Sequence, residues 1–106
     1  MANTPLALGI DLGTSGVRIA VIDASRSLLF SAATGYRQGL HAPCDWIRAL
    51  EELIPSIPTP LRRQLGALAV DGTSGTLLAC THQGDPLGDA LPYHQACQEQ
   101  IEHVRD

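Results

Sequence analysis

An aspartate followed by a turn of glycines and hydroxyls is the feature of this sequence best suited to chemistry. Asp11 ends the short apolar run LALGID, and the tetrapeptide Gly-Thr-Ser-Gly follows at residues 13–16. Backbone N–H groups and hydroxyls in such a turn bind phosphate oxygens, and a carboxylate beside them binds Mg²⁺ directly or through water. We therefore expect a phosphate and Mg²⁺ site here, with a plain glycine-rich turn capped by Asp11 as the alternative.

The context of this turn excludes two common nucleotide motifs. The segment after it, VRIAVID at residues 17–23, is rich in β-branched residues and predicts a second strand, so the turn closes a hairpin. Rossmann and P-loop fingerprints instead lead from a strand into a helix. All seven basic residues are arginine, which excludes a Walker A lysine within this segment. Arg18 would add a charged fork for phosphate.

The same arrangement occurs a second time along the chain. The apolar run ALAVD at residues 67–71 also ends in an aspartate, and Gly-Thr-Ser-Gly again follows, at 72–75. Asp71 is either a general base, which requires burial beside a substrate, or the cap of the turn that begins at Gly72.

The strands that must position these turns follow from the apolar pattern. Residues 6–34 predict three strands joined by short turns, an antiparallel meander, and residues 66–81 predict further strands of the same sheet. A strand, helical crossover and strand connection returns the chain in the same direction, so the first and fourth strands should be parallel. We therefore expect an α/β fold with Asp11 and Asp71 at one edge of its sheet.

Helices are expected between and after the strands. Apolar residues at helical spacing predict an amphipathic helix over 45–54, with Asp45 as its N-cap and Pro55 as its stop. A short helical turn from Thr59 should end at Gly66. A terminal helix is expected over 94–105, and its lack of a C-cap glycine or proline indicates that the natural polypeptide continues.

Composition limits the class of protein and its partners. The 106 residues, 44% of them hydrophobic, suit one small domain. The formal charge of −4 and the absence of a basic run argue against nucleic acid, and no run approaches the roughly 20 apolar residues of a membrane span. An odd number of cysteines without a CxxC pair indicates free thiols in the cytoplasm. These are Cys44, Cys80 and Cys97.

The two motifs carry a family resemblance. The segment GIDLGTSGVRIAVID at 9–23 resembles the first phosphate motif of the FGGY carbohydrate kinases, within the actin, Hsp70 and hexokinase-like fold group. The segment GALAVDGTSGTLLAC at 66–80 resembles the next stretch found in pentulose kinases of that family. The resemblance implies a ribonuclease H-like core, of which residues 1–106 form a partial N-terminal domain. It also implies that the C-terminal domain and the catalytic base lie beyond Asp106, so that the fragment alone has little or no activity.

The resemblance also implies roles for individual residues. Asp11 would position Mg²⁺, and the first turn would line the triphosphate site of ATP. Many family members have Trp or Tyr followed by Asn-Asp where this chain has Tyr93, His94 and Gln95, so the acid that binds sugar hydroxyls is missing here and the identity of the sugar is open. The implied ATP and Mg²⁺ contacts are Asp11, Gly13, Thr14, Ser15, Gly16 and Arg18, and the implied sugar contacts are Asp71, Thr73, Ser74, Gly75, Thr76, Tyr93, His94 and Gln95.

The expected function is ATP-dependent phosphorylation of a small sugar, with a ketopentose such as D-ribulose or D-xylulose preferred and a polyol or hexose left open. An Hsp70- or actin-like ATPase shares the first hairpin but does not account for the second motif. A nucleotide-binding module without catalysis is the other alternative, and a homodimer is left open.

Two weaker features complete the candidate residues. Trp46 is expected in the core, with sugar stacking as the alternative. His94, Cys97 and His103 contain metal-ligating groups, but the third lies off the helical face of the first two, so a core thiol and surface histidines are expected instead.

Overall fold

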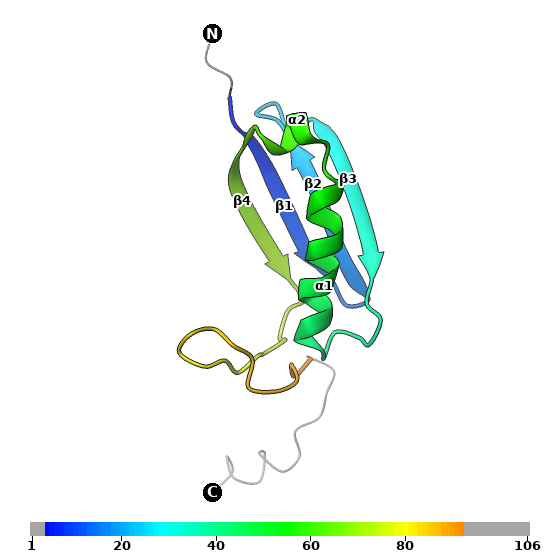
Figure 1. Cartoon of the computed structure of the whole chain (residues 1–106), viewed down its shortest axis with the longest axis vertical. Helices are drawn as coiled ribbons and strands as arrows, with labels where there is room; N and C mark the ends of the chain where they lie inside the picture. Colours follow the sequence, from blue (N-terminus) through cyan, green and yellow to red (C-terminus); the bar gives the residue numbers. More distant parts are fainter. Residues whose placement is uncertain (1–3, 93–106) are drawn as a thin grey trace, which may run out of the picture.

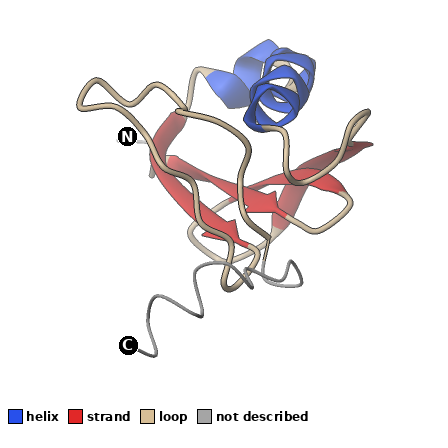
Figure 2. Ribbon diagram, turned by 90° about the horizontal axis from the view of Figure 1, so that it is seen from below, coloured by secondary structure: helices blue, strands red, loops and turns tan. Residues whose placement is uncertain are grey.

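The computed structural model describes residues 4–92, which form one four-stranded sheet with helices on a single face (Figures 1 and 2). The strand order is β3-β2-β1-β4. This arrangement confirms the α/β class and the meander predicted from the sequence. No helix in the described part of the chain is long and apolar enough to cross a bilayer. The strands are β1 (Leu6–Leu12), β2 (Gly16–Ile22), β3 (Leu28–Gly35) and β4 (Leu65–Gly72).

Strand pairing brings the two motifs together. Strand β1 is antiparallel to β2 and parallel to β4, while β2 and β3 are antiparallel. The parallel register sets Asp11 opposite Asp71 and Leu12 opposite Gly72. The prediction that both aspartates lie at the same edge of the sheet is therefore confirmed.

The prediction of a further strand after the second motif, up to residue 81, is wrong. Strand β4 ends at Gly72, and the following segment makes only isolated bridges, Leu77 to Leu91 and Cys80 to Pro86. The residues of this segment pair within a local loop because a turn reverses the direction of the chain. The Thr81 N–H donates to Asp85 O in this turn. This segment leaves the sheet instead of extending it (Figure 1).

The crossover from β3 to β4 contains three short helical elements, and its first helix begins earlier than predicted. Asp45 is not the N-cap: Ala42 occupies that position, Pro43 begins the helix, and Asp45 lies buried in the first turn. Proline suits this start because the first helical N–H needs no partner. The Asp45 carboxylate instead bonds to the loop before the helix. The elements are α1 (Pro43–Leu53), the 3₁₀ turn η1 (Ile54–Ser56) and α2 (Thr59–Arg62).

Gly66 does not end α2 as predicted. The helix ends at Arg62 and β4 begins at Leu65, so Gly66 lies inside the strand. A Cβ at Gly66 would come 2.5 Å from Pro5 Cβ, so glycine permits the close approach of the segment that enters β1. The helix predicted over 94–105 lies outside the described residues.

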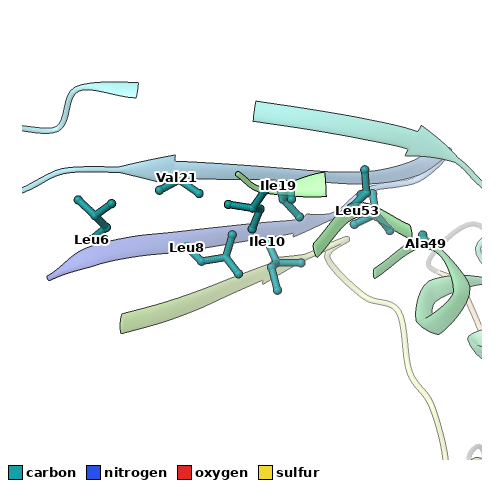
Figure 3. Packing of buried hydrophobic residues seen from close by; sticks show 9 residues of the cluster. Leu6, Leu8, Ile10, Ile19, Val21, Ala49 and Leu53 are labelled. Carbon is teal, nitrogen blue, oxygen red and sulfur yellow. The ribbon is translucent and has the colours of Figure 1, made fainter. Parts of the chain in front are cut away.

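The core lies between α1 and the β1–β2 ladder (Figure 3). Alternate residues of each strand face the helix, as the two-residue period of a strand requires. This packing fixes the strand ends that carry the motifs. On the same face of β4, however, Leu68 and Val70 remain 63% and 59% exposed. The buried cluster comprises Leu6, Leu8, Ile10, Val17, Ile19, Val21, Ala49, Leu53 and Ile57.

Candidate functional site

The site is built at the carboxyl ends of β1 and β4, beside the start of α1 (Figure 1). Asp11 and Asp71 are both exposed, and neither carboxylate bonds to another residue in the described part of the chain. Asp71 therefore lacks the burial that a general base requires, and it does not cap the Gly72 turn there. Thr73 holds that turn instead, because its N–H and its hydroxyl donate to Leu12 O at 3.0 and 3.1 Å.

The first turn offers unpaired amides. Gly13 N–H donates to Gly16 O at 2.9 Å and closes the hairpin, whereas the N–H groups of Thr14 and Ser15 find no acceptor within residues 4–92. Successive free amides in a turn form a concavity that attracts anions. A Cβ at Gly16 would lie 2.3 Å from Thr34 O, so only glycine permits this approach of β2 to β3.

A hollow of about 350 Å³ lies beside the turn, and we call it the hairpin hollow. Asp11 and Arg18 are register partners on the sheet face opposite the core, and no ion pair joins them among the described residues. A guanidinium, backbone amides and a carboxylate that have no other partner in the described residues suit an anion accompanied by a divalent cation. The predicted residue Thr14 is exposed but does not line the hollow. Its lining is Asp11, Gly13, Ser15, Gly16, Val17, Arg18, Ala33, Thr34 and Gly35.

A second hollow, of about 170 Å³, lies on the α1 side of the same strand ends, and we call it the α1 hollow. Thr76 Oγ1 is buried in this region without a partner among the described residues. Trp46 Nε1–H donates to Leu40 O at 2.8 Å, which fixes the orientation of the indole ring. Apolar walls with one unsatisfied hydroxyl suit a small ligand that has both C–H and O–H groups. The lining residues are Leu12, Leu40, Trp46, Gly72, Thr73 and Thr76.

The sequence-based candidates separate into four groups. Most of the first motif lines the hairpin hollow, and Gly72, Thr73 and Thr76 line the α1 hollow. Asp71, Ser74 and Gly75 are exposed and line neither hollow, and Gly75 has a positive φ of 75°. The other candidates lie outside the described residues: Tyr93, His94 and Gln95 of the predicted sugar site, and Cys97 and His103 of the rejected metal site.

Two further observations bear on sequence-based expectations. Within the described residues, no group of three His, Cys, Asp or Glu side chains is placed to hold a metal ion. Cys44 and Cys80 are free thiols, as expected. Leu40 was not among the predicted site residues, whereas Trp46 was expected in the core with sugar stacking as the alternative and is instead half-buried beside the α1 hollow. The position of Trp46 at the helix start was visible in the sequence, but its place beside Thr76 was not.

The fold is similar to that of solved proteins. The solved structures that it resembles include sugar kinases. A ligand-bound xylulose kinase from Lactobacillus acidophilus matches with a TM-score of 0.76 and 17% identity over 94% of this chain and 22% of the kinase. A Plasmodium falciparum glycerol kinase solved with ADP matches with a TM-score of 0.72 and 14% identity over 100% of this chain and 24% of the kinase.

A xylulose kinase from Bifidobacterium adolescentis reaches 22% identity and a TM-score of 0.69, over 87% of this chain and 18% of the kinase. No family model matches the sequence. At these identities the likeness establishes the fold. The chain spans about a fifth of the length of the kinases that it matches.

Proposed function

We propose that the protein carrying this chain is an FGGY-family carbohydrate kinase, which transfers the γ-phosphoryl group of ATP to a hydroxyl of a small sugar. A ketopentose such as D-ribulose or D-xylulose is the preferred acceptor. The observation that carries the proposal is the parallel register of Asp11 and Asp71, which sets two Gly-Thr-Ser-Gly turns at neighbouring strand ends. The sheet then represents part of a ribonuclease H-like core, and the chain supplies part of the kinase cleft.

The hairpin hollow supports binding of the triphosphate. Free amides of the first turn and the exposed guanidinium of Arg18 are donors for phosphate oxygens. The Asp11 carboxylate, which has no competing partner among the described residues, would hold Mg²⁺. Bound Mg²⁺ neutralises charge that develops on the phosphates. The donor set in this hollow therefore fits both groups.

The α1 hollow supports binding of the acceptor. The Thr76 hydroxyl has a hydrogen bond to give or accept, and Trp46 offers an apolar surface for the C–H face of a sugar. The two hollows share the end of β1, where Leu12 lines the α1 hollow and Asp11 lines the hairpin hollow. Tyr93, His94 and Gln95 would complete the sugar site from the following segment.

Within this chain, catalysis rests on positioning and charge. Phosphoryl transfer depends on in-line placement of donor and acceptor and on stabilisation of phosphate charge, to which Asp11, Arg18 and the turn amides contribute. The base that accepts the sugar hydroxyl proton is assigned to a segment beyond Asp106, so residues 1–106 alone should turn over ATP little. The free thiols favour a reducing, cytoplasmic location.

The decisive experiment measures ADP release by the natural gene product with Mg-ATP. The acceptors are D-ribulose, D-xylulose, L-ribulose, glycerol and none, and Asp11→Ala is compared with Asp85→Asn, an exposed carboxylate away from both hollows. Sugar-dependent release that Asp11→Ala abolishes and Asp85→Asn leaves intact supports the kinase and names its acceptor. Sugar-independent release would favour an actin- or Hsp70-like ATPase, and no release would indicate a binding module.

A further inference from the structure

Tyr36 bonds at two points to the first Gly-Thr-Ser-Gly turn, residues 13–16, which we call the phosphate turn. No sequence motif marks Tyr36. Its Oη–H donates to Gly13 O at 2.8 Å, and its backbone N–H donates to Ser15 O at 3.0 Å. Gly13 and Ser15 are the first and third residues of the turn. One residue directly after β3 therefore holds the turn on both sides.

These bonds determine which way the free amides point. In a planar trans peptide, the C=O of one residue and the N–H of the next point in opposite directions. Holding the carbonyls of Gly13 and Ser15 toward Tyr36 therefore turns the N–H groups of Thr14 and Gly16 away from it. The Tyr36 ring packs against the core, whereas Asp11 and Arg18 of the hairpin hollow lie on the opposite face of the sheet.

The segment that carries Tyr36 is itself fixed by the first two turns of α1. Arg48 Nη2 donates to Gly35 O at 2.8 Å, directly before Tyr36. On the other side, the Asp45 carboxylate accepts the N–H groups of Gln38 and Gly39 at 2.6 and 3.2 Å. The position of Tyr36 is thus set by the helix start as well as by β3.

The Tyr36 hydroxyl remains a proton donor throughout the neutral range. Its partial burial raises the pKa of the phenol above its ordinary value, and the negative charges of Asp45 and Asp11 raise it further. The bond to Gly13 O needs this proton, because a carbonyl oxygen only accepts.

We infer that Tyr36 is a positioning residue for the triphosphate, which acts by holding the carbonyls of Gly13 and Ser15 and thereby sets the direction of the Thr14 and Gly16 N–H groups at the border of the hairpin hollow. The inference rests on the proposed function for the identity of the anion. It adds a residue that touches neither nucleotide nor sugar and acts through the backbone of the turn.

Tyr36→Phe tests this role, because the ring that packs on the core remains and only the hydroxyl is lost. The first readout is hydrogen exchange at the Gly13 amide, whose bond to Gly16 O closes the turn. Loss of one hydrogen bond should speed its exchange about five- to tenfold. The amides of Ile19 and Val21 in the buried part of β2 serve as the internal control and should not change.

The second readout is steady-state kinetics of the natural gene product. Tyr36→Phe should raise KM for Mg-ATP about five- to tenfold and leave KM for the sugar within about twofold, since only the phosphate turn is loosened. Trp46→Phe is the matched aromatic contrast: it lies at the α1 hollow and should change KM for the sugar instead. A purely structural role for Tyr36 would lower the melting temperature without this separation.

The outcomes distinguish the role of Tyr36 from the proposed kinase function. Unchanged exchange at Gly13 in Tyr36→Phe overturns the role of Tyr36 even if the protein is a sugar kinase. Faster exchange at Gly13 together with an unchanged KM for Mg-ATP overturns the link from the turn to the triphosphate. Absence of ATP turnover in the unsubstituted protein overturns the proposed function, while the exchange result still decides whether Tyr36 holds the turn.

Discussion

Asp11 and Asp71 are register partners at the carboxyl ends of two parallel strands, although 60 positions separate them in the sequence (71 minus 11). Each is followed by the same Gly-Thr-Ser-Gly tetrapeptide. The first turn borders the hairpin hollow and the second borders the α1 hollow. A repeated local motif thus yields two different sites, because the turns meet different neighbours, β3 in one case and the start of α1 in the other.

The carboxylate of Asp11 should matter for turnover far more than for stability. Asp11→Asn keeps the shape of the side chain and removes its charge, so the carboxylate proposed to hold Mg²⁺ is lost from an exposed position. We expect kcat/KM for Mg-ATP to fall about 100-fold or more. The melting temperature should stay close to that of the unsubstituted protein. Asp85→Asn, measured in parallel, should leave both quantities unchanged, and an active Asp11→Asn protein would remove Asp11 from the site.

Gly16 should tolerate no side chain, whereas Gly72 should. A Cβ at Gly16 would meet Thr34 O at 2.3 Å, while nothing lies within 4 Å of a Cβ at Gly72. Forcing β2 and β3 apart costs about 1–3 kcal/mol, so Gly16→Ala should lower the free energy of unfolding by that amount in urea titrations. Gly72→Ala should change it by less than about 0.5 kcal/mol. Equal losses in the two variants would contradict the close strand approach.

The strands and their register could be predicted because the signals are local. Alternating apolar residues and glycine turns mark β1 to β3, and the rule for a helical crossover makes β4 parallel to β1. The same reasoning fails where contacts between distant parts of the chain determine the local structure. Asp45 resembles an N-cap in the sequence, but its partners Gln38 and Gly39 belong to the preceding loop. The apolar run after Gly72 resembles a strand, yet a nearby turn pairs it within its own loop.

The site was predictable only in part for the same physical reason. The first motif could be placed because the hairpin that carries it is contiguous in sequence. The α1 hollow could not, since Trp46 and Thr76 are joined only by the fold, and Tyr36 reaches Gly13 across 23 positions. A single sequence shows residue types and periods, but it does not show such contacts.

The hydroxyl of Thr76 should cost stability in the absence of ligand. Its Oγ1 is buried without a partner in the described residues, so Thr76→Val should raise the free energy of unfolding by about 1 kcal/mol. The same change should raise KM for the sugar acceptor about fivefold or more, because the ligand loses a hydrogen bond. Thr73→Val is the contrast: its hydroxyl donates to Leu12 O, so its loss should destabilise the protein. Lower stability in Thr76→Val would show that its hydroxyl already has a partner.

Asp45 should link the stability of the fold to acidic pH. Burial alone would raise the pKa of Asp45, but hydrogen bonds from the Gln38 N–H, the Arg48 side chain and the Gly39 N–H outweigh it and lower the pKa from 3.8 to about 2. A pKa that is lower in the folded than in the unfolded state stabilises the fold above the unfolded value, and this contribution is lost as protons bind. Stability should therefore fall between about pH 3.8 and about pH 2.

The variant Asp45→Asn isolates this contribution, because it keeps the size of the side chain and removes its titration. Urea midpoints measured from pH 6 down to about pH 2 should show a weaker acid-dependent decline in Asp45→Asn than in the unsubstituted protein. Glu51→Gln, an exposed carboxylate elsewhere on α1, should keep the original decline. Because Asp45 also fixes Gln38 and Gly39 beside Tyr36, its protonation should speed exchange at the Gly13 amide over the same pH range, once intrinsic exchange is subtracted. A Gly13 exchange rate that does not follow Asp45 would separate the helix start from the phosphate turn.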